Sequence, residues 1–550
     1  MKNKVYRIVI LLIGLLLSIQ TLGLAADYQW SVPVDGKDRE SRAFLWIPPF
    51  CQQVRGLIFC SQVILEKLVC DNPQIREACA SQGLGIVIVF RSPLTTFNYS
   101  EGADKILQKI LDDLATESGY SEIAKAPLLT IGHSGGAIGA WNVAYWNPKR
   151  VMGILTLHAA AMIAPPIWDY TIAPNGKGRT DGIPVMTVSG ENESWNNNNG
   201  SIEKHWRWLR GELLNLRGRY YNAQVCEVVQ PGAGHFNFDE HLAKLWALFI
   251  KKAAKYRISS IQKDRIESPE LKTIPEDAGW LTDINIITPN KFAPVAFKQF
   301  KGDPSLAFWH MDEELARAVE AFPAFYGGKT DQRVTFVQDG KPLPASWITE
   351  LKFEPLEDGL SFKIKGDFLK QTPEGLAGGG LPLNHSTSTV AFSLIGGWGG
   401  GGEQTGTDTF RIRFDHFGLS RTCCNLQIMA YNKGDSRFKY AEQAGQVKFP
   451  ERNKDGRPQT ITFQALDNVF AGTKSLELKG TSNAGLPISY FVRSGPAEIK
   501  GNKLIFTSIP PRSKFPVKVL VVAYQWGRTT ESLTQTAEPV EEIILINKMQ

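Results

Sequence analysis

The stretch at residues 127–140, PLLTIGHSGGAIGA, constrains the fold of this chain more than any other. Its apolar half predicts a buried strand, and its small residues after Gly136 predict the start of a helix. A G-x-S-x-G pattern joins the two, with Ser134 at its centre. Glycines on both sides leave room for a tight turn on which a serine is open to reaction. The stretch therefore predicts a nucleophilic Ser134 at one edge of a sheet.

Strands and helices alternate on both sides of this turn, and the buried strands lack the alternation of an exposed sheet face. Such a chain predicts an α/β fold with a doubly wound parallel sheet, and a site at the carboxyl ends of its strands. The catalytic domain is expected to cover residues 27–255. The expected strands are 42–48, 56–60, 85–90, 151–157, 184–189 and 224–229, and the main expected helices are 72–82, 105–116, 205–216 and 240–255.

A serine hydroxyl needs a base to take its proton and an acid to orient that base. His235 is the candidate base, because it lies in the glycine-rich loop PGAGHFN at 231–237, directly after an expected strand. The loop after the preceding strand carries two carboxylates, Glu191 and Glu193. Glu193 is the preferred acid, because it stands three residues past Gly190, where the loop can turn back toward the histidine. Glu191 remains the alternative.

Two backbone N–H groups are needed to stabilise the negative oxygen of a tetrahedral intermediate. Gly135, directly after the nucleophile, is the first expected donor, and Gln62, in the loop after the strand 56–60, is the second. Trp168 and Trp195 offer aromatic faces on which a sugar could stack. Together with Arg91 they are the expected substrate-binding side chains.

Residues 1–26 have the composition of a signal peptide, with Lys2, Lys4 and Arg7 before an apolar run at 8–17. The run is short for a membrane span, so we expect an exported protein without a span in its mature chain, located in the periplasm, secreted or at the cell surface. Those three basic residues supply three of the six net positive charges. The remaining charge of about +3 is too weak to indicate a nucleic-acid partner.

The seven cysteines are an odd number, so at least one of them is unpaired. Their spacing allows a bridge between Cys51 and Cys60 and another between Cys70 and Cys79. Buried free thiols fit a domain with a large core equally well. The sequence leaves the pairing open.

The remainder of the chain divides into three expected parts. Residues 256–330 combine a charged linker with a strap that packs on the catalytic domain. From there on, short strands and turn signals such as Asp339-Gly340 replace the alternating pattern. They predict a β-sandwich domain at 331–460 and an Ig-like β-sandwich at 461–550.

The segments GHSGG, SGENE and GAGHF, in this order and spacing, resemble those of an α/β-hydrolase over about residues 30–255. The segments GLPISYFV, GPAEIKGNKL and VVAYQWG resemble Ig-like modules appended to bacterial polysaccharide-degrading enzymes. The first resemblance implies serine ester hydrolysis through an acyl-enzyme, without a cofactor or metal. The arrangement is similar to that of gut-bacterial pectin methylesterases. It implies methyl or acetyl esters on plant cell-wall polysaccharide, an acidic glycan such as pectin, as the substrate.

Several other functions stay open at this point. A feruloyl or acetyl-xylan esterase is the nearest alternative. A peptidase is another, because the same triad cleaves amides. A non-catalytic glycan-binding or scaffold protein with an inactive hydrolase domain belongs to a different class. The presence of all three triad residue types in the expected order argues against that last class.

Overall fold

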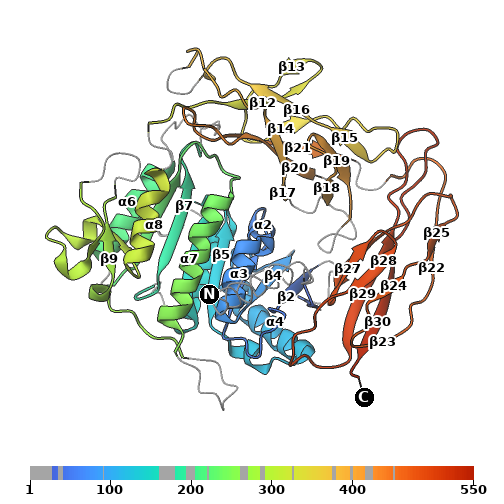
Figure 1. Cartoon of the computed structure of the whole chain (residues 1–550), viewed down its shortest axis with the longest axis horizontal. Coiled ribbons are helices and arrows are strands. Elements are labelled where there is room, and N and C mark those ends of the chain that lie inside the picture. The colour runs from blue at the N-terminus through green and yellow to red at the C-terminus, as the bar shows by residue number, and fades with distance from the viewer. Residues whose placement is uncertain are drawn as a thin grey trace, which may run out of the picture.

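The computed structural model contains an α/β domain and two groups of β-sheets that lie beside it (Figure 1). The expected signal peptide lies outside the residues that the structure describes. Within the described residues, no helix has the length and apolar character that crossing a membrane requires. The described residues are 28–34, 41–90, 92–159, 180–193, 205–219, 222–259, 270–284, 291–324, 328–374, 379–396, 401–414, 425–449 and 453–549.

The α/β domain is built on an eight-stranded sheet with the order β1-β2-β4-β3-β5-β6-β7-β8, which is the order of the α/β-hydrolase fold. The strands from β3 to β8 are parallel, whereas β1 and β2 are antiparallel to their neighbours. The sheet is therefore mixed rather than wholly parallel, because the short connection between β1 and β2 cannot make a crossover. The strands are β1 (Trp30–Pro33), β2 (Arg42–Trp46), β3 (Gly56–Ser61), β4 (Leu84–Phe90), β5 (Leu128–His133), β6 (Val151–Leu157), β7 (Val185–Gly190) and β8 (Val225–Gln230).

Helices cover both faces of this sheet. The step from β3 to β4 runs along the sheet in the direction opposite to all later steps, so right-handed crossovers place α3 on one face and α4, α5 and α6 on the other. Helix α7 packs against α3. All parallel strands then end at one edge, where the loops that carry the candidate residues meet. The helices are α2 (Glu66–Asp71), α3 (Pro73–Gln82), α4 (Ala103–Ser118), α5 (Gly136–Trp146), α6 (His205–Arg219) and α7 (Glu240–Arg257).

The segment after α7 packs on the α/β domain as a strap. It forms the small sheet β10-β9-β11 and helix α8, which contacts α7 and β8. His310 is buried and shares a hydrogen bond of 2.8 Å with the hydroxyl of Thr282, while Asp312 forms an ion pair of 2.6 Å with Lys252. These two side chains therefore serve the packing of the strap. The elements are β9 (Trp280–Thr282), β10 (Val295–Ala296), β11 (Phe308–His310) and α8 (Glu313–Ala324).

The second domain follows the strap, and its described residues form three sheets, with the orders β13-β12-β16, β14-β21-β20-β17 and β15-β19-β18. Phe336, Phe362 and Ile428 from different sheets share its core. The strands are β12 (Val334–Gln338), β13 (Lys341–Pro342), β14 (Thr349–Leu351), β15 (Ser361–Lys363), β16 (Lys365–Phe368), β17 (Ala391–Gly396), β18 (Gly402–Gln404), β19 (Thr409–Ile412), β20 (Asn425–Asn432) and β21 (Ala441–Lys448).

The last domain contains the sheets β23-β30-β29-β26, β24-β28-β27 and β22-β25. The first two sheets face each other across a core that includes Leu504, Val519 and Ile544. The strands are β22 (Ile461–Phe463), β23 (Val469–Phe470), β24 (Ser475–Glu477), β25 (Gly480–Ser482), β26 (Ser489–Ser494), β27 (Ala497–Lys500), β28 (Lys503–Phe506), β29 (Val517–Tyr524) and β30 (Val540–Asn547).

The last domain is docked on the end of α4 through a charged contact. The two terminal nitrogens of the Arg512 guanidinium donate to the carboxylate of Glu122, at 2.9 and 3.2 Å. The Glu122 side chain is fully buried and also accepts the N–H of Val54 at 3.0 Å. The N–H of Lys514 donates to the carbonyl of Ser118 at 2.9 Å. The contact is therefore specific and partly buried.

The five cysteines in the described part of the chain are free and buried. Neither of the two bridges that the spacing allows is formed. The fold instead places Sγ of Cys60 at 3.4 Å from Sγ of Cys70, because α2 folds back over the end of β3. Cys423 and Cys424 lie outside the described residues.

Candidate active site

Ser134 stands on the turn between β5 and α5, with a φ of +51°. This left-handed backbone costs a residue with a Cβ about 1–2 kcal/mol, so the surrounding structure must hold it. The N–H of Ser134 donates to the carbonyl of Leu157 at 3.0 Å. A Cβ on Gly132 would lie 2.3 Å from the carbonyl oxygen of Gly136, so the turn closes only with glycine there. Ser134 is half-buried at the carboxyl edge of the sheet.

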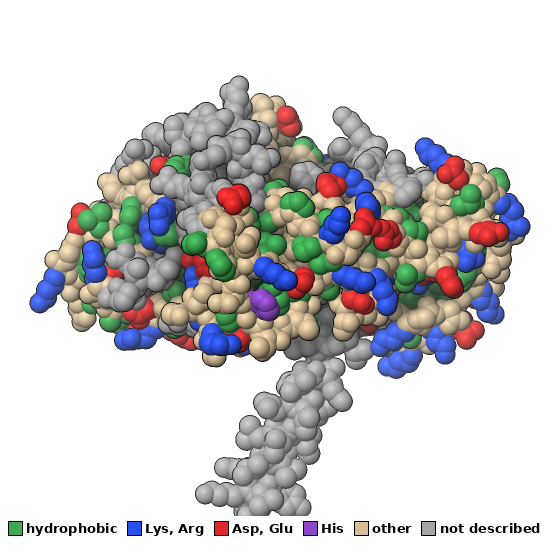
Figure 2. Space-filling model, turned by 90° about the horizontal axis from the view of Figure 1, so that it is seen from above, with side chains coloured by type: hydrophobic (Ala, Val, Ile, Leu, Met, Phe, Trp, Pro, Cys, Tyr) green, Lys and Arg blue, Asp and Glu red, His purple; other side chains and the backbone are tan. Residues whose placement is uncertain are grey.

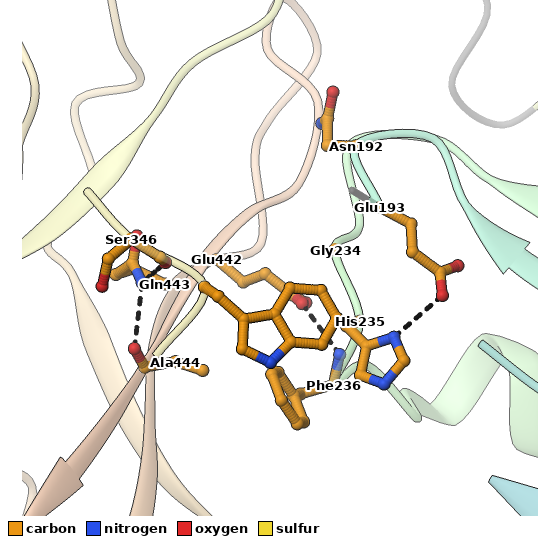
Figure 3. Close-up of a pocket in the computed structure, with 10 residues that line it drawn as sticks. Asn192, Glu193, Gly234, His235, Phe236, Ser346, Glu442, Gln443 and Ala444 are labelled. Carbon is orange, nitrogen blue, oxygen red and sulfur yellow. Dashed lines mark hydrogen bonds and ion pairs between the residues drawn. The ribbon is translucent and has the colours of Figure 1, made fainter. Parts of the chain in front are cut away.

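His235 lies in the loop after β8, and its Nδ1 atom is 2.8 Å from Oε1 of Glu193 (Figure 3). Glu193 comes from the turn after β7, the neighbouring parallel strand. A backbone hydrogen bond of 2.8 Å from the N–H of Asn192 to the carbonyl of Ala233 ties this turn to the histidine loop. The sheet itself thus brings the carboxylate to the imidazole, and Nε2 lies on the opposite side of the ring.

Glu193 is buried between two imidazoles. Burial alone would raise its pKa, but the imidazoles of His158 and His235 outweigh burial and hold the pKa of Glu193 well below its usual value. Nδ1 of His158 lies 3.5 Å from Oε2 of Glu193. Burial likewise opposes the charged form of His158, but Glu193 more than compensates and raises the pKa of His158. Glu193 is therefore ionised at neutral pH and able to stabilise positive charge on His235.

Two further histidines surround this pair. Nε2 of His133 lies 2.9 Å from the backbone oxygen of His235. Burial, together with His235 and His158, holds the pKa of His133 well below its usual value, so it packs as a neutral group. His158 was missed from the sequence, although it stands directly after β6 at the same sheet edge. Its Nε2 lies 2.8 Å from the backbone oxygen of Asn237, so it supports the histidine loop as well as Glu193.

Glu191, the alternative acid, has a different contact. Its two carboxylate oxygens both lie 3.0 Å from Nζ of Lys439 in the second domain. Oε2 also accepts the N–H of Gly232 at 2.9 Å. Of the two carboxylates after β7, Glu193 contacts the candidate base and Glu191 joins the two domains.

The structure corrects one of the two expected oxyanion donors. The backbone N–H of Gln62 donates to the carbonyl of Val89 at 2.7 Å and extends the β3–β4 ladder by one residue, so it is not presented to Ser134. The N–H of Gly135 lies ahead of the first turn of α5, where a helix has no carbonyl four residues earlier to accept it. Its position beside Ser134 fits the expected role.

Glu66, at the start of α2, connects the loop after β3 to the nucleophile turn. Its Oε2 atom accepts the N–H groups of Val63 and Ile64 at 2.8 and 3.0 Å, and Oε1 accepts the N–H of His133 at 2.8 Å. Burial raises the pKa of Glu66 to about 7, although these N–H groups act in the opposite direction. The loop after β3 therefore directs its N–H groups inward. Glu66 was missed because one acid in an apolar stretch has no periodic signal.

The second domain closes one side of the site. Trp347 lies in the loop between β13 and β14, and its ring centroid is 4.3 Å from that of His235 and 5.6 Å from that of Phe236. Trp347, His235 and Glu193 line a small pocket with residues of β21 (Figure 3). Trp347 was missed because its sequence surroundings are those of an ordinary β-domain loop, far from the motifs.

The histidine loop is shaped against β21 of the second domain. Glu442 accepts the N–H of Phe236 at 3.2 Å, and burial raises the pKa of Glu442. Gly232 has a φ of +78°, and a Cβ there would lie 2.1 Å from the carbonyl oxygen of Tyr440. The loop that carries His235 thus approaches the second domain so closely that only glycine fits at position 232.

The expected substrate-binding residues Trp168, Trp195 and Arg91 lie outside the described residues, so their role stays a prediction.

No protein-family model matches the chain, and no curated protein matches it. Among solved structures the chain is similar to an S-formylglutathione hydrolase from Agrobacterium tumefaciens, with 14% identity and a TM-score of 0.29 over 41% of this chain and 93% of that chain. It is also similar to Est1E from Butyrivibrio proteoclasticus, with 15% identity and a TM-score of 0.27 over 41% and 96% of the two chains. A third is the esterase domain of a Rhodothermus marinus protein, with 16% identity and a TM-score of 0.27 over 41% and 97%.

Proposed function

We propose that the protein is an exported serine carboxylic-ester hydrolase that removes methyl or acetyl groups from plant cell-wall polysaccharide, with pectin as the first candidate. The observation that supports ester hydrolysis is the constellation at the sheet edge. A strained serine on a strand-to-helix turn shares this edge with a buried imidazole that is oriented by an ionised carboxylate. These are the parts that nucleophilic acyl transfer requires.

In the proposed mechanism, Oγ of Ser134 attacks the ester carbonyl carbon while Nε2 of His235 takes the hydroxyl proton. Glu193 stabilises the resulting imidazolium through Nδ1, and the N–H of Gly135 stabilises the negative oxygen. Collapse of the tetrahedral intermediate breaks the bond to the leaving alcohol, which receives the proton from His235. Water then repeats the sequence on the acyl-enzyme and releases the acid. With a methyl-esterified uronate the alcohol is methanol; with an acetylated sugar the acid released is acetate.

The choice of polysaccharide is supported by the leader-like residues 1–26 and by the two β-domains after the hydrolase domain. Charge gives little direction. On the face shown in Figure 2, basic and acidic side chains are interspersed, without a large region of one sign. On this face an acidic glycan would therefore be held by local contacts rather than by a general positive field.

The test is the release of methanol and acetate from methylated and acetylated pectins by the wild type and by Ser134→Ala. We expect the wild type to release methanol, acetate or both, and Ser134→Ala to lose that activity by a factor of about 10⁴ to 10⁶ while it keeps its circular dichroism spectrum. Equal release by both proteins would contradict the nucleophile. Release of neither product, with turnover of feruloylated xylan, acetylated xylan or a peptide, would replace pectin by that substrate. No turnover at all would favour a non-catalytic glycan-binding protein.

A further inference from the structure

Trp347 is an exposed aromatic residue placed beside a buried candidate base. Its side chain is in ring contact with His235, yet the residue is 41% exposed, while His235 is 9% exposed. Aromatic side chains are common in the lining of ligand sites, where a ligand can pack on their faces, and Trp347 lines the pocket beside His235. One part of the indole therefore covers the imidazole, and another part is left facing the pocket.

The loop that carries Trp347 is held in place by a hydrogen bond to β21. Nε2 of Gln443 donates to the carbonyl of Ser346 at 2.7 Å and to the carbonyl of Ala444 at 2.9 Å, which ties the loop to β21. The hydroxyl of Ser346 lies 3.4 Å from that of Thr349. An aromatic side chain on an anchored loop is preorganised for binding, because little conformational entropy remains to be lost.

The proposed reaction determines which part of the substrate lies next to the indole of Trp347. In the proposed reaction the leaving oxygen must lie within about 3 Å of Nε2 of His235 to receive its proton. In a methyl uronate the ring carbon is bonded to the carbonyl carbon, and in an acetylated sugar it is bonded to the leaving oxygen. A sugar ring is therefore bonded directly to the ester group in both cases, on the acyl side in the first and on the leaving-group side in the second, so it lies close to the reacting atoms beside His235.

We propose that Trp347 is a substrate-binding residue whose indole stacks on the pyranose ring that carries the ester, so that the second domain supplies part of the active site. This inference rests on the proposed function. A pyranose presents a face of C–H groups, and such a face packs on the electron-rich face of an indole. The second domain then selects esters of sugars over other small esters.

The experiment compares Trp347→Ala, Trp347→Phe and Phe470→Ala, the last as an exposed aromatic control in the last domain, where Phe470 is 55% exposed. Each is assayed with methylated pectin and with 4-nitrophenyl acetate, which has no sugar. We expect Trp347→Ala to lower kcat/KM on pectin about ten-fold, through KM, and to change kcat/KM on 4-nitrophenyl acetate less than about three-fold. Trp347→Phe should restore most of the loss, and Phe470→Ala should behave as wild type.

Equal losses on both substrates would show that Trp347 only covers His235, and an unchanged KM on pectin would show that it does not contact the sugar. Either result overturns the proposal. Failure of the proposed function is recognised separately, because the wild type would then release neither methanol nor acetate. In that case calorimetric binding of galacturonate and xylose oligomers to Ser134→Ala, with and without Trp347→Ala, decides. Weaker binding without Trp347 supports the sugar contact, and absence of any Trp347-dependent binding overturns it.

Discussion

Oε1 of Glu193 lies 2.8 Å from Nδ1 of His235, while Glu191, two residues earlier in the same turn, binds Lys439 in another domain. The same short loop thus carries one carboxylate toward the candidate base and a second toward the domain interface. Because the two side chains differ in partner but not in chemical type, they form a matched pair for mutation.

Glu193→Gln is expected to lower kcat for ester hydrolysis by about 10⁴, because an amide neither stabilises an imidazolium nor fixes the productive tautomer. Glu191→Gln should keep kcat within about ten-fold and instead lower the free energy of unfolding by about 2 kcal/mol through the weakened contact with Lys439. Steady-state kinetics and urea denaturation measure the two effects. A larger kcat loss in Glu191→Gln than in Glu193→Gln would exchange the two roles.

Gly132→Ala should destabilise the protein by at least about 3 kcal/mol and abolish hydrolysis, because the new methyl group would meet the carbonyl of Gly136 at 2.3 Å. The control is Gly211→Ala on α6, where a Cβ meets nothing within 4 Å. That variant should gain about 0.5–1 kcal/mol from helix propensity and keep full activity. Wild-type activity and melting temperature in Gly132→Ala would show that the turn has more room than the structure indicates.

Glu66 makes stability depend on pH. Its pKa is raised to about 7 in the folded chain, so the folded state keeps a proton that the unfolded state releases at lower pH. The stabilisation that the protonated Glu66 carboxyl gives the folded state is fully present below the pKa that this group has in the unfolded chain. It is lost as the pH rises through the folded-state pKa of about 7. Between pH 5 and pH 7, the unfolding free energy of the wild type should therefore fall by about 2 kcal/mol more than that of Glu66→Gln.

Urea denaturation at both pH values measures this difference, with Glu240→Gln as a control because the Glu240 side chain is 76% exposed. The control should reproduce the wild-type pH dependence. If Glu66→Gln also reproduces it, Glu66 does not titrate in this range.

Arg512→Met should cost about 3 kcal/mol, because it leaves the carboxylate of Glu122 buried without its cation. Lys518→Met removes a neighbouring ion pair with Glu117 across the same two domains, but both side chains there are largely exposed. It should cost less than about 1 kcal/mol. Limited proteolysis between the domains and urea denaturation give the comparison. Equal costs would mean that burial of Glu122 does not determine the strength of this contact.

Much of the α/β domain could be predicted, because most of the buried parallel strands are rich in apolar residues and helices such as α4 have a clear apolar face. β6 was predicted with its observed limits, 151–157. Short elements without such patterns, β1 and α2, were missed. The antiparallel edge was missed as well, since strand direction depends on connections and not on the strands themselves.

The candidate site, like the fold, could be predicted only in part. Ser134, Glu193 and His235 follow the ends of β5, β7 and β8, which are parallel strands of one sheet, so the topology brings their loops to the same edge. The prediction of Gln62 as an oxyanion donor was wrong, because its backbone N–H donates to the carbonyl of Val89 on the neighbouring strand. The sequence of one strand does not show whether the N–H after its last residue is paired with the next strand. Trp347 and Glu442 depend on how a separate domain docks, which no local pattern records.

The close contact between Gly232 and Tyr440 joins two parts of the chain that are synthesised at different times. Ser134, Glu193 and His235 all emerge from the ribosome long before Tyr440 and β21, which contact the loop that carries His235. Since the second domain is synthesised after the α/β domain, we expect the loop around His235 to take its final shape only once the second domain has folded against it.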